Sequence, residues 1–336
     1  MHCKRIKKSS ADIKRNAAVS FIHASGSCAY RTGDVNDRMK TAILTDTHSG
    51  ILQKEATENG IFLLPTPFIV NGVQHAVGVD FSSEDFYREL NAGAEVSTSQ
   101  PSPGDILKLW DEILQSYDEI VCIPLSSGLS GGYQTMVMLA EEAPYQGRVF
   151  PVDNTSVSVT QQRAVYNAKA LAARGYTAVQ IKEILERHRK NNLIFITVTT
   201  LKYLKKGGRI TPAAAALGSL LGIKPVLEID GAKLDAFTKV RTMAKAREVM
   251  LNAAQQTLDT RLQDPEAAHS YIMVADAENE EGADELMAAA RARWPKAEFH
   301  RAPLALAIAC HVGPGALGLV AERKLPELEA EPEEMH

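Results

Sequence analysis

From Met39 onward, short apolar runs alternate with amphipathic stretches along most of the chain. Thr41–Leu44 and Glu119–Ile123 are largely apolar and lead into polar turns, which is typical of buried strands. Between them, Ser102-Pro103-Gly104-Asp105 supplies a serine N-cap followed by a proline, so a helix is expected to begin there. The alternation predicts a parallel sheet covered by helices on both faces over residues 40–155.

The second half of the chain combines long helical patterns with a hairpin. Helices are expected at about 158–174 and 178–190, and a strand at Leu193–Val198. Two apolar runs flank Asp230-Gly231, a strong signal for a two-residue β-hairpin turn. A hairpin among helices implies a mixed sheet, so two α/β domains are expected. Further strands are expected at 61–64, 67–70, 148–152, 226–229, 234–238, 271–275, 297–300 and 316–320, and further helices at 83–91, 131–143, after 211–212, 242–258 and 281–293.

These patterns set the predicted domain boundaries. Residues 1–38 lack sustained apolar periodicity and are expected to be a disordered extension. Residues 39–157 should form the parallel α/β/α domain and residues 158–325 the second α/β domain with its mixed sheet. The acidic residues 326–336 are expected to be a disordered tail.

Charge and composition exclude several classes of function. Residues 1–38 hold eight Lys or Arg against three Asp, but the rest of the chain holds 29 basic against 38 acidic residues. Such a body lacks the basic footprint of a nucleic-acid-binding protein. No window approaches the roughly 18 consecutive apolar residues of a membrane span. The cysteines form neither C-x-x-C pairs nor zinc spacings, which favours free thiols in the cytoplasm and no metal site; they are Cys3, Cys28, Cys122 and Cys310.

Three polar, glycine-rich segments interrupt this apolar sequence: Thr98–Asp105, Leu125–Tyr133 and His311–Gly315. The second follows a predicted strand and precedes a predicted helix, where open α/β sheets bind ligands and helix N-termini attract anions. Ser130, near the start of that helix, can donate a hydrogen bond to a carboxylate without adding charge. Alternatively, Ser130 only caps its own helix and the preceding serines shape a turn.

The same segment admits an enzymatic alternative. Gly128-Leu129-Ser130-Gly131-Gly132 matches G-x-S-x-G, and Asp276 and His311 follow in the order of an α/β-hydrolase triad. A nucleophile elbow turns directly off its strand, however, whereas Pro124–Ser127 interpose a longer loop. Cys310-His311 does not suggest a nucleophile pair, because neighbours on a strand point to opposite faces.

A basic run, Lys205–Arg209, follows the strand at Leu193–Val198. Such runs are usually solvated turns, but an arginine is also suited to bidentate contacts with a carboxylate or phosphate. No Walker A motif occurs in the chain, so hydrolysis of a nucleotide by this protein is not expected.

In this order and spacing, the motifs of the chain resemble those of the DegV family from Met39 to about Val320. The matching segments are Ala42–Asp46, Gly78–Asp80, Thr98–Asp105, Leu125–Gly131, Tyr203–Ile210, Lys239–Arg241 and His311–Gly315. The loop Asp46-Thr47-His48-Ser49-Gly50 departs from the Asp-Ser-Thr or Asp-Ser-Ser usual in the family. Thr242, Gly132 and Pro124 are further departures, which bear on loop shape and acyl selectivity.

The resemblance implies a two-domain DegV-like fold that encloses one long-chain fatty acid. Such proteins are the fatty-acid-binding, non-catalytic subunits of bacterial fatty acid kinase, and a separate kinase subunit transfers phosphate to the presented carboxylate for phospholipid synthesis. The implied partners are therefore a fatty acid and that catalytic subunit, with no cofactor and no nucleic acid. Transient contact with a membrane surface is compatible with this role. A dihydroxyacetone-kinase-like substrate domain, in which a histidine holds a small ketone, is a second enzymatic alternative.

The resemblance also assigns site residues. By matching motif, Thr98 and Ser130 would donate hydrogen bonds to the carboxylate, and His311 would contact it. Four further residues are candidates for contact with the head group or the kinase: Ser99, Ser127, Arg209 and Arg241. Whatever their roles, the acyl tail is expected to supply most of the affinity, and the polar groups are expected to orient the head group.

Overall fold

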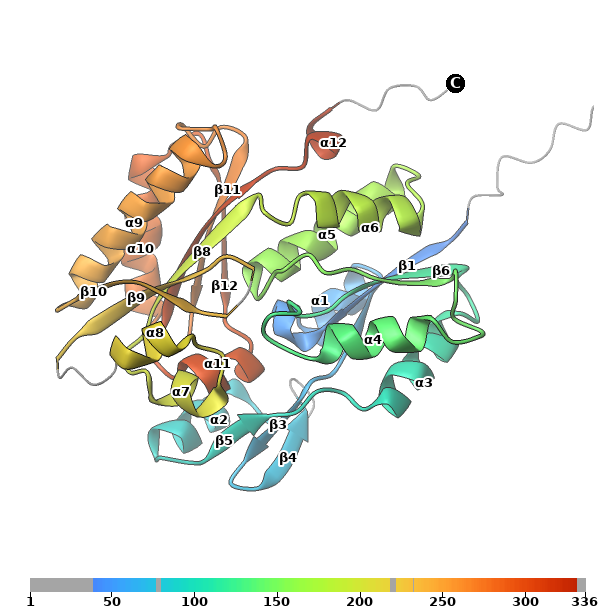
Figure 1. Ribbon diagram of the computed structural model, residues 1–336, viewed down its shortest axis with the longest axis horizontal. Helices are drawn as coiled ribbons and strands as arrows, with labels where there is room; N and C mark the ends of the chain where they lie inside the picture. The colour runs from blue at the N-terminus through green and yellow to red at the C-terminus, as the bar shows by residue number, and fades with distance from the viewer. Residues whose placement is uncertain (1–38, 77–79, 218–221, 232, 331–336) are drawn as a thin grey trace, which may run out of the picture. The chain divides into compact units, whose positions relative to one another are not determined.

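A computed structural model describes residues 39–76, 80–217, 222–231 and 233–330 (Figure 1). The extension predicted at residues 1–38 lies outside the described residues, as do residues 77–79 and 331–336. In the part of the chain that is described, no helix is both long and apolar enough to cross a bilayer.

The first sheet is parallel throughout, as predicted for the N-terminal half. Its strands are β1 (Thr41–Asp46), β2 (Ile61–Leu64), β6 (Glu119–Ile123) and β7 (Val149–Pro151). They pair in the order β2-β1-β6-β7. The covering helices are α3 (Pro103–Ile113), α4 (Gly132–Ala140), α5 (Val159–Ala173) and α6 (Ala178–Arg187). α5 and α6 pack on one face and α3 and α4 on the other, which confirms the α/β/α arrangement.

The second sheet is mixed, as the hairpin implied. Its strands are β8 (Asn192–Thr197), β9 (Lys224–Ile229), β10 (Asp235–Val240), β11 (Ser270–Asp276), β12 (Glu298–Pro303) and β13 (Leu317–Arg323). They pair in the order β10-β9-β8-β13-β11-β12, and within this sheet β11 and β12 run parallel. The helices α9 (Met243–Thr260) and α10 (Glu280–Arg293) cover one face (Figure 1).

A third, antiparallel sheet with the order β4-β3-β5 was not predicted as a sheet. Its strands are β3 (Pro67–Val70), β4 (Val73–Ala76) and β5 (Val96–Thr98). It packs with α2 (Ser83–Asn91) toward the other face of the mixed sheet. The remaining short elements are η1 (Thr47–Ser49), α1 (Gln53–Glu58), α7 (Lys202–Gly207), α8 (Pro212–Ala216), α11 (Leu306–Val312) and α12 (Pro326–Glu329).

The packing of α5 and α6 bears on the domain boundary predicted at 157/158. Val165 and Leu171 of α5 share a buried cluster with Val121 of the parallel sheet. We therefore propose that the boundary lies just before β8, near residue 191.

The disordered tail predicted at residues 326–336 starts too early in the chain, because its first residues form α12. This helix is held by Arg174, whose guanidinium donates to carbonyl oxygens of Glu327, Leu328 and Ala330 at 2.7–2.9 Å.

A buried acid lies where α5 approaches the mixed sheet. Glu322 of β13 is buried, and its Oε2 has no hydrogen-bond partner among the described residues. Burial raises the pKa of Glu322 to about 8, and the nearby Arg163 only partly opposes this effect. Arg163 itself lies over the ring of Tyr271, 4.7 Å from its centroid.

The substitution Glu322→Gln should remove a pH-dependent loss of stability. Folding raises the pKa of this acid from 4.5 to about 8, so the folded state holds the proton more tightly. The stabilising effect is complete below pH 4.5 and is lost as the pH rises toward 8. Urea denaturation between pH 5.5 and 8 should show a slope of unfolding free energy less negative by about 1 kcal/mol per pH unit in the variant. The exposed control Glu248→Gln should keep the original slope; an unchanged slope for Glu322→Gln would contradict this account.

Candidate functional site

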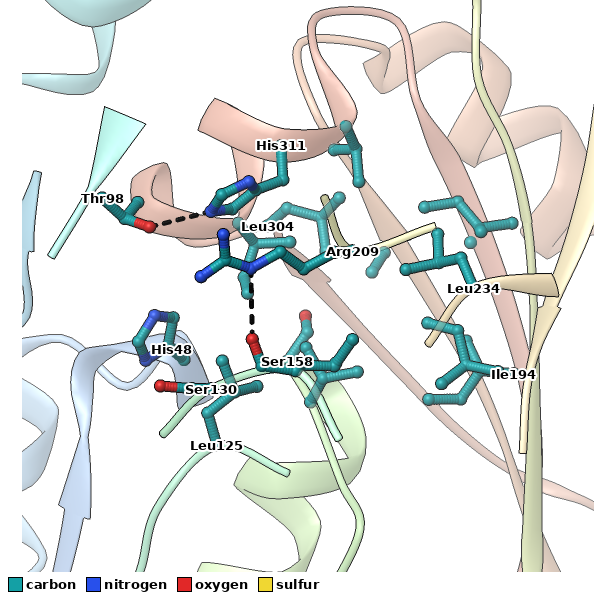
Figure 2. A pocket seen from close by; sticks show the side chains of 18 of the residues that line it. His48, Thr98, Leu125, Ser130, Ser158, Ile194, Arg209, Leu234, Leu304 and His311 are labelled. Carbon is teal, nitrogen blue, oxygen red and sulfur yellow. Dashed lines mark hydrogen bonds between the residues drawn. The ribbon is translucent and has the colours of Figure 1, made fainter. Parts of the chain in front are cut away.

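A cavity of about 160 Å³ lies among the parallel sheet, the mixed sheet and α11. More than half of the residues that line it are apolar, and the mixed sheet contributes several of them, including Ile194 and Ile196 of β8 and Val320 of β13. Figure 2 shows the polar side chains gathered on one side of the cavity and apolar side chains such as Ile194 and Leu234 on the other. The cavity thus has an apolar body and one polar end.

The polar end is assembled from segments that are far apart in the sequence. Its side chains are His48 of η1, Thr98 at the end of β5, Ser130 before α4, Arg209 after α7 and His311 of α11. His48 and Ser130 follow β1 and β6, which are adjacent parallel strands. They therefore lie at the edge where strands end at their carboxyl termini, as sequence analysis expected for a ligand site.

Thr98 and His311 are in direct contact. Thr98 Oγ1 lies 2.8 Å from Nε2 of His311, and Figure 2 shows this bond bordering the cavity. Burial lowers the pKa of His311 to about 4, with the charges of Arg209 and His48 acting in the same direction. His311 is therefore neutral at pH 7. If Nε2 carries the hydrogen, the hydroxyl of Thr98 remains free to donate to a ligand.

Ser130 lies one residue before the N-cap of α4, which is Gly131 and not the serine itself. Its Oγ accepts a hydrogen bond from the backbone N–H of Gly132 at 3.2 Å, so it does support the start of α4. This bond uses a lone pair of the oxygen, and the hydroxyl hydrogen remains available to the cavity. The bond to Gly132 therefore leaves Ser130 able to donate to a ligand.

The basic run Lys205–Arg209 includes the end of helix α7, which packs against His311. α7 ends at Gly207, and Gly208 adopts a left-handed conformation with φ +70°. A Cβ at Gly207 would come within 2.2 Å of His311 Nδ1, so only glycine permits this approach. Arg209 then reaches the cavity, where its Nε donates to the carbonyl oxygen of Leu129 at 3.2 Å.

Asp46 and His48 form a buried pair that sequence analysis did not assign to the site. Asp46 Oδ1 lies 3.0 Å from His48 Nδ1, and Oδ2 accepts from the backbone N–H of Leu125 at 2.9 Å. Burial alone would raise the pKa of Asp46, but the charge of His48 and hydrogen bonds, including one from Gln161, hold it below its ordinary value. The sequence contained one indication of this pair: His48 lies in the loop after β1, which departs from the pattern usual in the family.

The other candidates occupy different positions. Ser99 lines the cavity. Ser127 does not; its hydroxyl donates to Asp153 Oδ2 at 2.6 Å. Arg241 is exposed immediately after β10 and does not line the cavity.

The hydrolase triad is not assembled. Asp276 lies 3.4 Å from an Arg301 guanidinium nitrogen and accepts from the backbone N–H of Asn279 at 3.0 Å. It lines a separate groove, and His311 Nδ1 has no partner among the described residues. Because no carboxylate of the described residues orients His311, the triad of Ser130, His311 and Asp276 is not formed. The same residues include no cluster of three or more His, Cys, Asp or Glu side chains suited to a metal ion.

Comparison with known families agrees with this architecture. The family model described as "Uncharacterised protein, DegV family" matches residues 40–324. The chain belongs to the DegV family. Protein DegV of Bacillus subtilis is 29% identical over 287 residues, which cover 84% of this chain and 98% of that protein. The expected family membership and fold class are thereby confirmed.

Solved structures of DegV family members superpose closely. The fatty-acid-binding DegV family protein of Thermus thermophilus gives a TM-score of 0.76 at 29% identity, with 85% of this chain and 100% of that chain covered. DegV of Bacillus subtilis, described as a fatty acid binding protein, gives 0.75 at 27% identity over 85% and 100% of the two chains. Fatty acid binding is thus a property of similar DegV family proteins.

Proposed function

We propose that this protein binds one long-chain fatty acid in its cavity, with the carboxyl group at the polar end. The observation that carries the proposal is the geometry of the cavity, which is apolar along its body and polar at one end. The hydroxyl groups of Thr98 and Ser130 can each donate to a carboxylate, and the guanidinium of Arg209 adds positive charge. The similar proteins that bind fatty acids support the same ligand class.

The acyl tail and the carboxyl head group of the ligand contribute differently to the binding free energy. Transferring on the order of 15 methylenes out of water contributes roughly 12 kcal/mol at ~0.8 kcal/mol each. Association and ordering oppose this by several kcal/mol. The acyl tail therefore supplies most of the affinity, and the polar residues prevent the carboxylate from being buried without partners.

We further propose that the protein does not catalyse a reaction alone but presents the carboxyl group to a separate kinase subunit, which forms an acyl phosphate. Among the described residues, the histidine at the polar end that a carboxylate orients is His48, and Ser130 Oγ is hydrogen-bonded to the backbone of Gly132 rather than to that ring; this favours a carrier over the hydrolase. A dihydroxyacetone-kinase-like role is disfavoured because a small ketone would leave the long apolar wall unfilled.

Organic extraction of the purified protein followed by lipid mass spectrometry tests the ligand class. We expect near-stoichiometric long-chain fatty acid. After delipidation, the protein should take up added palmitate in a one-to-one ratio. Recovery of no lipid together with no uptake of palmitate would overturn the proposal, and a covalent adduct on His311 would support the ketone-binding alternative.

A further inference from the structure

His48 is an unusual group to find at the polar end of this cavity. It replaces the hydroxyl residue common in the family after the first strand, and its side chain is only 9% exposed. The short helix η1 that carries it packs against α5 and α11. Figure 2 shows His48 on the polar side of the cavity, together with Ser130 and Thr98.

The hydrogen bonds of His48 fix the orientation of its ring. Nδ1 lies 3.0 Å from the carboxylate of Asp46 and 3.3 Å from the hydroxyl of Thr66. Because Asp46 is an ionised acceptor, Nδ1 must carry a hydrogen; a lone pair facing that carboxylate would be repelled. Asp46 is in turn held by the N–H of Leu125 and by Gln161. The imidazole is therefore anchored through one nitrogen.

The other nitrogen, Nε2, is left for a ligand. It has no hydrogen-bond partner among the residues that the structure describes, and the side chain lines the cavity. With Nδ1–H fixed, Nε2 offers a lone pair to a protonated carboxyl group or, when the ring is charged, a hydrogen to a carboxylate. Either protonation state of a fatty acid head group finds a partner.

We propose that His48 is a further head-group ligand in this chain, positioned by Asp46, and that it increases selectivity for a carboxyl group over a hydroxyl group. The inference rests on the proposed fatty acid binding and adds a residue to it. The acid gains the contact with Nε2 and the positive charge of Arg209 nearby. A fatty alcohol of the same length gains the same apolar burial but a weaker polar contact.

Two substitutions at one position separate the roles of the two nitrogens. In His48→Asn the amide can still donate to Asp46, as Nδ1 does, but it cannot reach the site of Nε2. In His48→Gln the longer amide can place a donor near the position of Nε2. Delipidated protein is titrated with palmitic acid and with hexadecanol, which share a sixteen-carbon chain, and the ratio of the two affinities is measured.

We expect His48→Asn to lower the acid-to-alcohol affinity ratio by roughly tenfold or more, because a hydrogen bond to a charged group is lost. His48→Gln should recover part of the ratio. The matched control is His75→Asn, which alters another His–Asp pair, 3.2 Å apart, that does not line the cavity; its ratio should stay unchanged.

The outcomes distinguish the two proposals. A purely structural role for His48 would lower both affinities together and leave the ratio unchanged in both variants, which would overturn the assignment of His48. An unsubstituted protein that binds neither palmitic acid nor hexadecanol would overturn the proposed function, and this assignment with it. Thermal unfolding of each variant shows whether the fold is retained, and the ratio in His48→Gln decides the question if His48→Asn does not fold.

Discussion

The variant Ala275→Phe should lose nearly all of its bound fatty acid while keeping its fold. Ala275 of β11 is paired with Gly318 of β13, and both residues line the cavity. Two small residues facing each other across adjacent strands leave the space that an acyl chain would occupy. A phenylalanine side chain at position 275 would project into that space and displace the ligand.

We expect lipid occupancy, measured by extraction and mass spectrometry, to fall at least tenfold. Overpacking a filled core typically costs about 1–3 kcal/mol, but here the added ring enters an existing cavity, so the cost should be at the lower end. The control is Ala275→Cys, since cysteine behaves as a small apolar residue and should leave occupancy close to normal. Full occupancy in Ala275→Phe would place the acyl chain elsewhere.

Elements with a strong local signal could be predicted closely from the sequence. The strand Glu119–Ile123 and the helix Ser83–Asn91 have the predicted bounds. The helix start at Ser102-Pro103 is confirmed, since Ser102 Oγ accepts from the Asp105 N–H at 3.1 Å. The antiparallel pairing of β9 and β10 is also confirmed, although the loop between them, residues 230–234, is longer than the predicted two-residue turn. In each case the information lies within a few residues of the element.

Elements that depend on distant partners could not be predicted in this way. Cys310 and His311 were treated as neighbours on a strand, but both lie in the helix α11, whose small residues such as Ala309 let it pack closely on β5 and α7. β5 is three residues long and is stabilised mainly by its pairing with β3. Local periodicity carries no information about such pairings.

The polar end of the cavity illustrates the same limit. Thr98, Ser130 and His311 were predicted as site residues from motifs, and the structure brings all three to one cavity. His48 was noticed only as a departure from the family pattern. Its position depends on Asp46, which is anchored by the backbone of Leu125, 79 residues away along the chain. No pattern around residue 48 could have indicated that anchor.

The variant Ser130→Ala should separate binding from presentation of the carboxyl group. The substitution removes one hydroxyl donor at the polar end and leaves the apolar wall intact. Loss of one hydrogen bond to a charged group costs about 1.5–3 kcal/mol, which is small beside the roughly 12 kcal/mol gross contribution of the acyl tail. Lipid occupancy should therefore remain appreciable.

In Ser130→Ala, phosphorylation of the bound fatty acid should decrease more than lipid occupancy does. A carboxylate displaced by about 1 Å is a poor acceptor, so acyl phosphate formation with the partner kinase and ATP should fall on the order of 100-fold in Ser130→Ala. Thr135→Ala, which removes a hydroxyl of α4 that bonds the backbone of Gly131 and does not line the cavity, should keep both occupancy and rate. Both quantities are measured on the same preparations, together with esterase activity in the absence of a partner. An esterase activity that disappears with Ser130, and no partner-dependent acyl phosphate in either protein, would replace the carrier with the hydrolase.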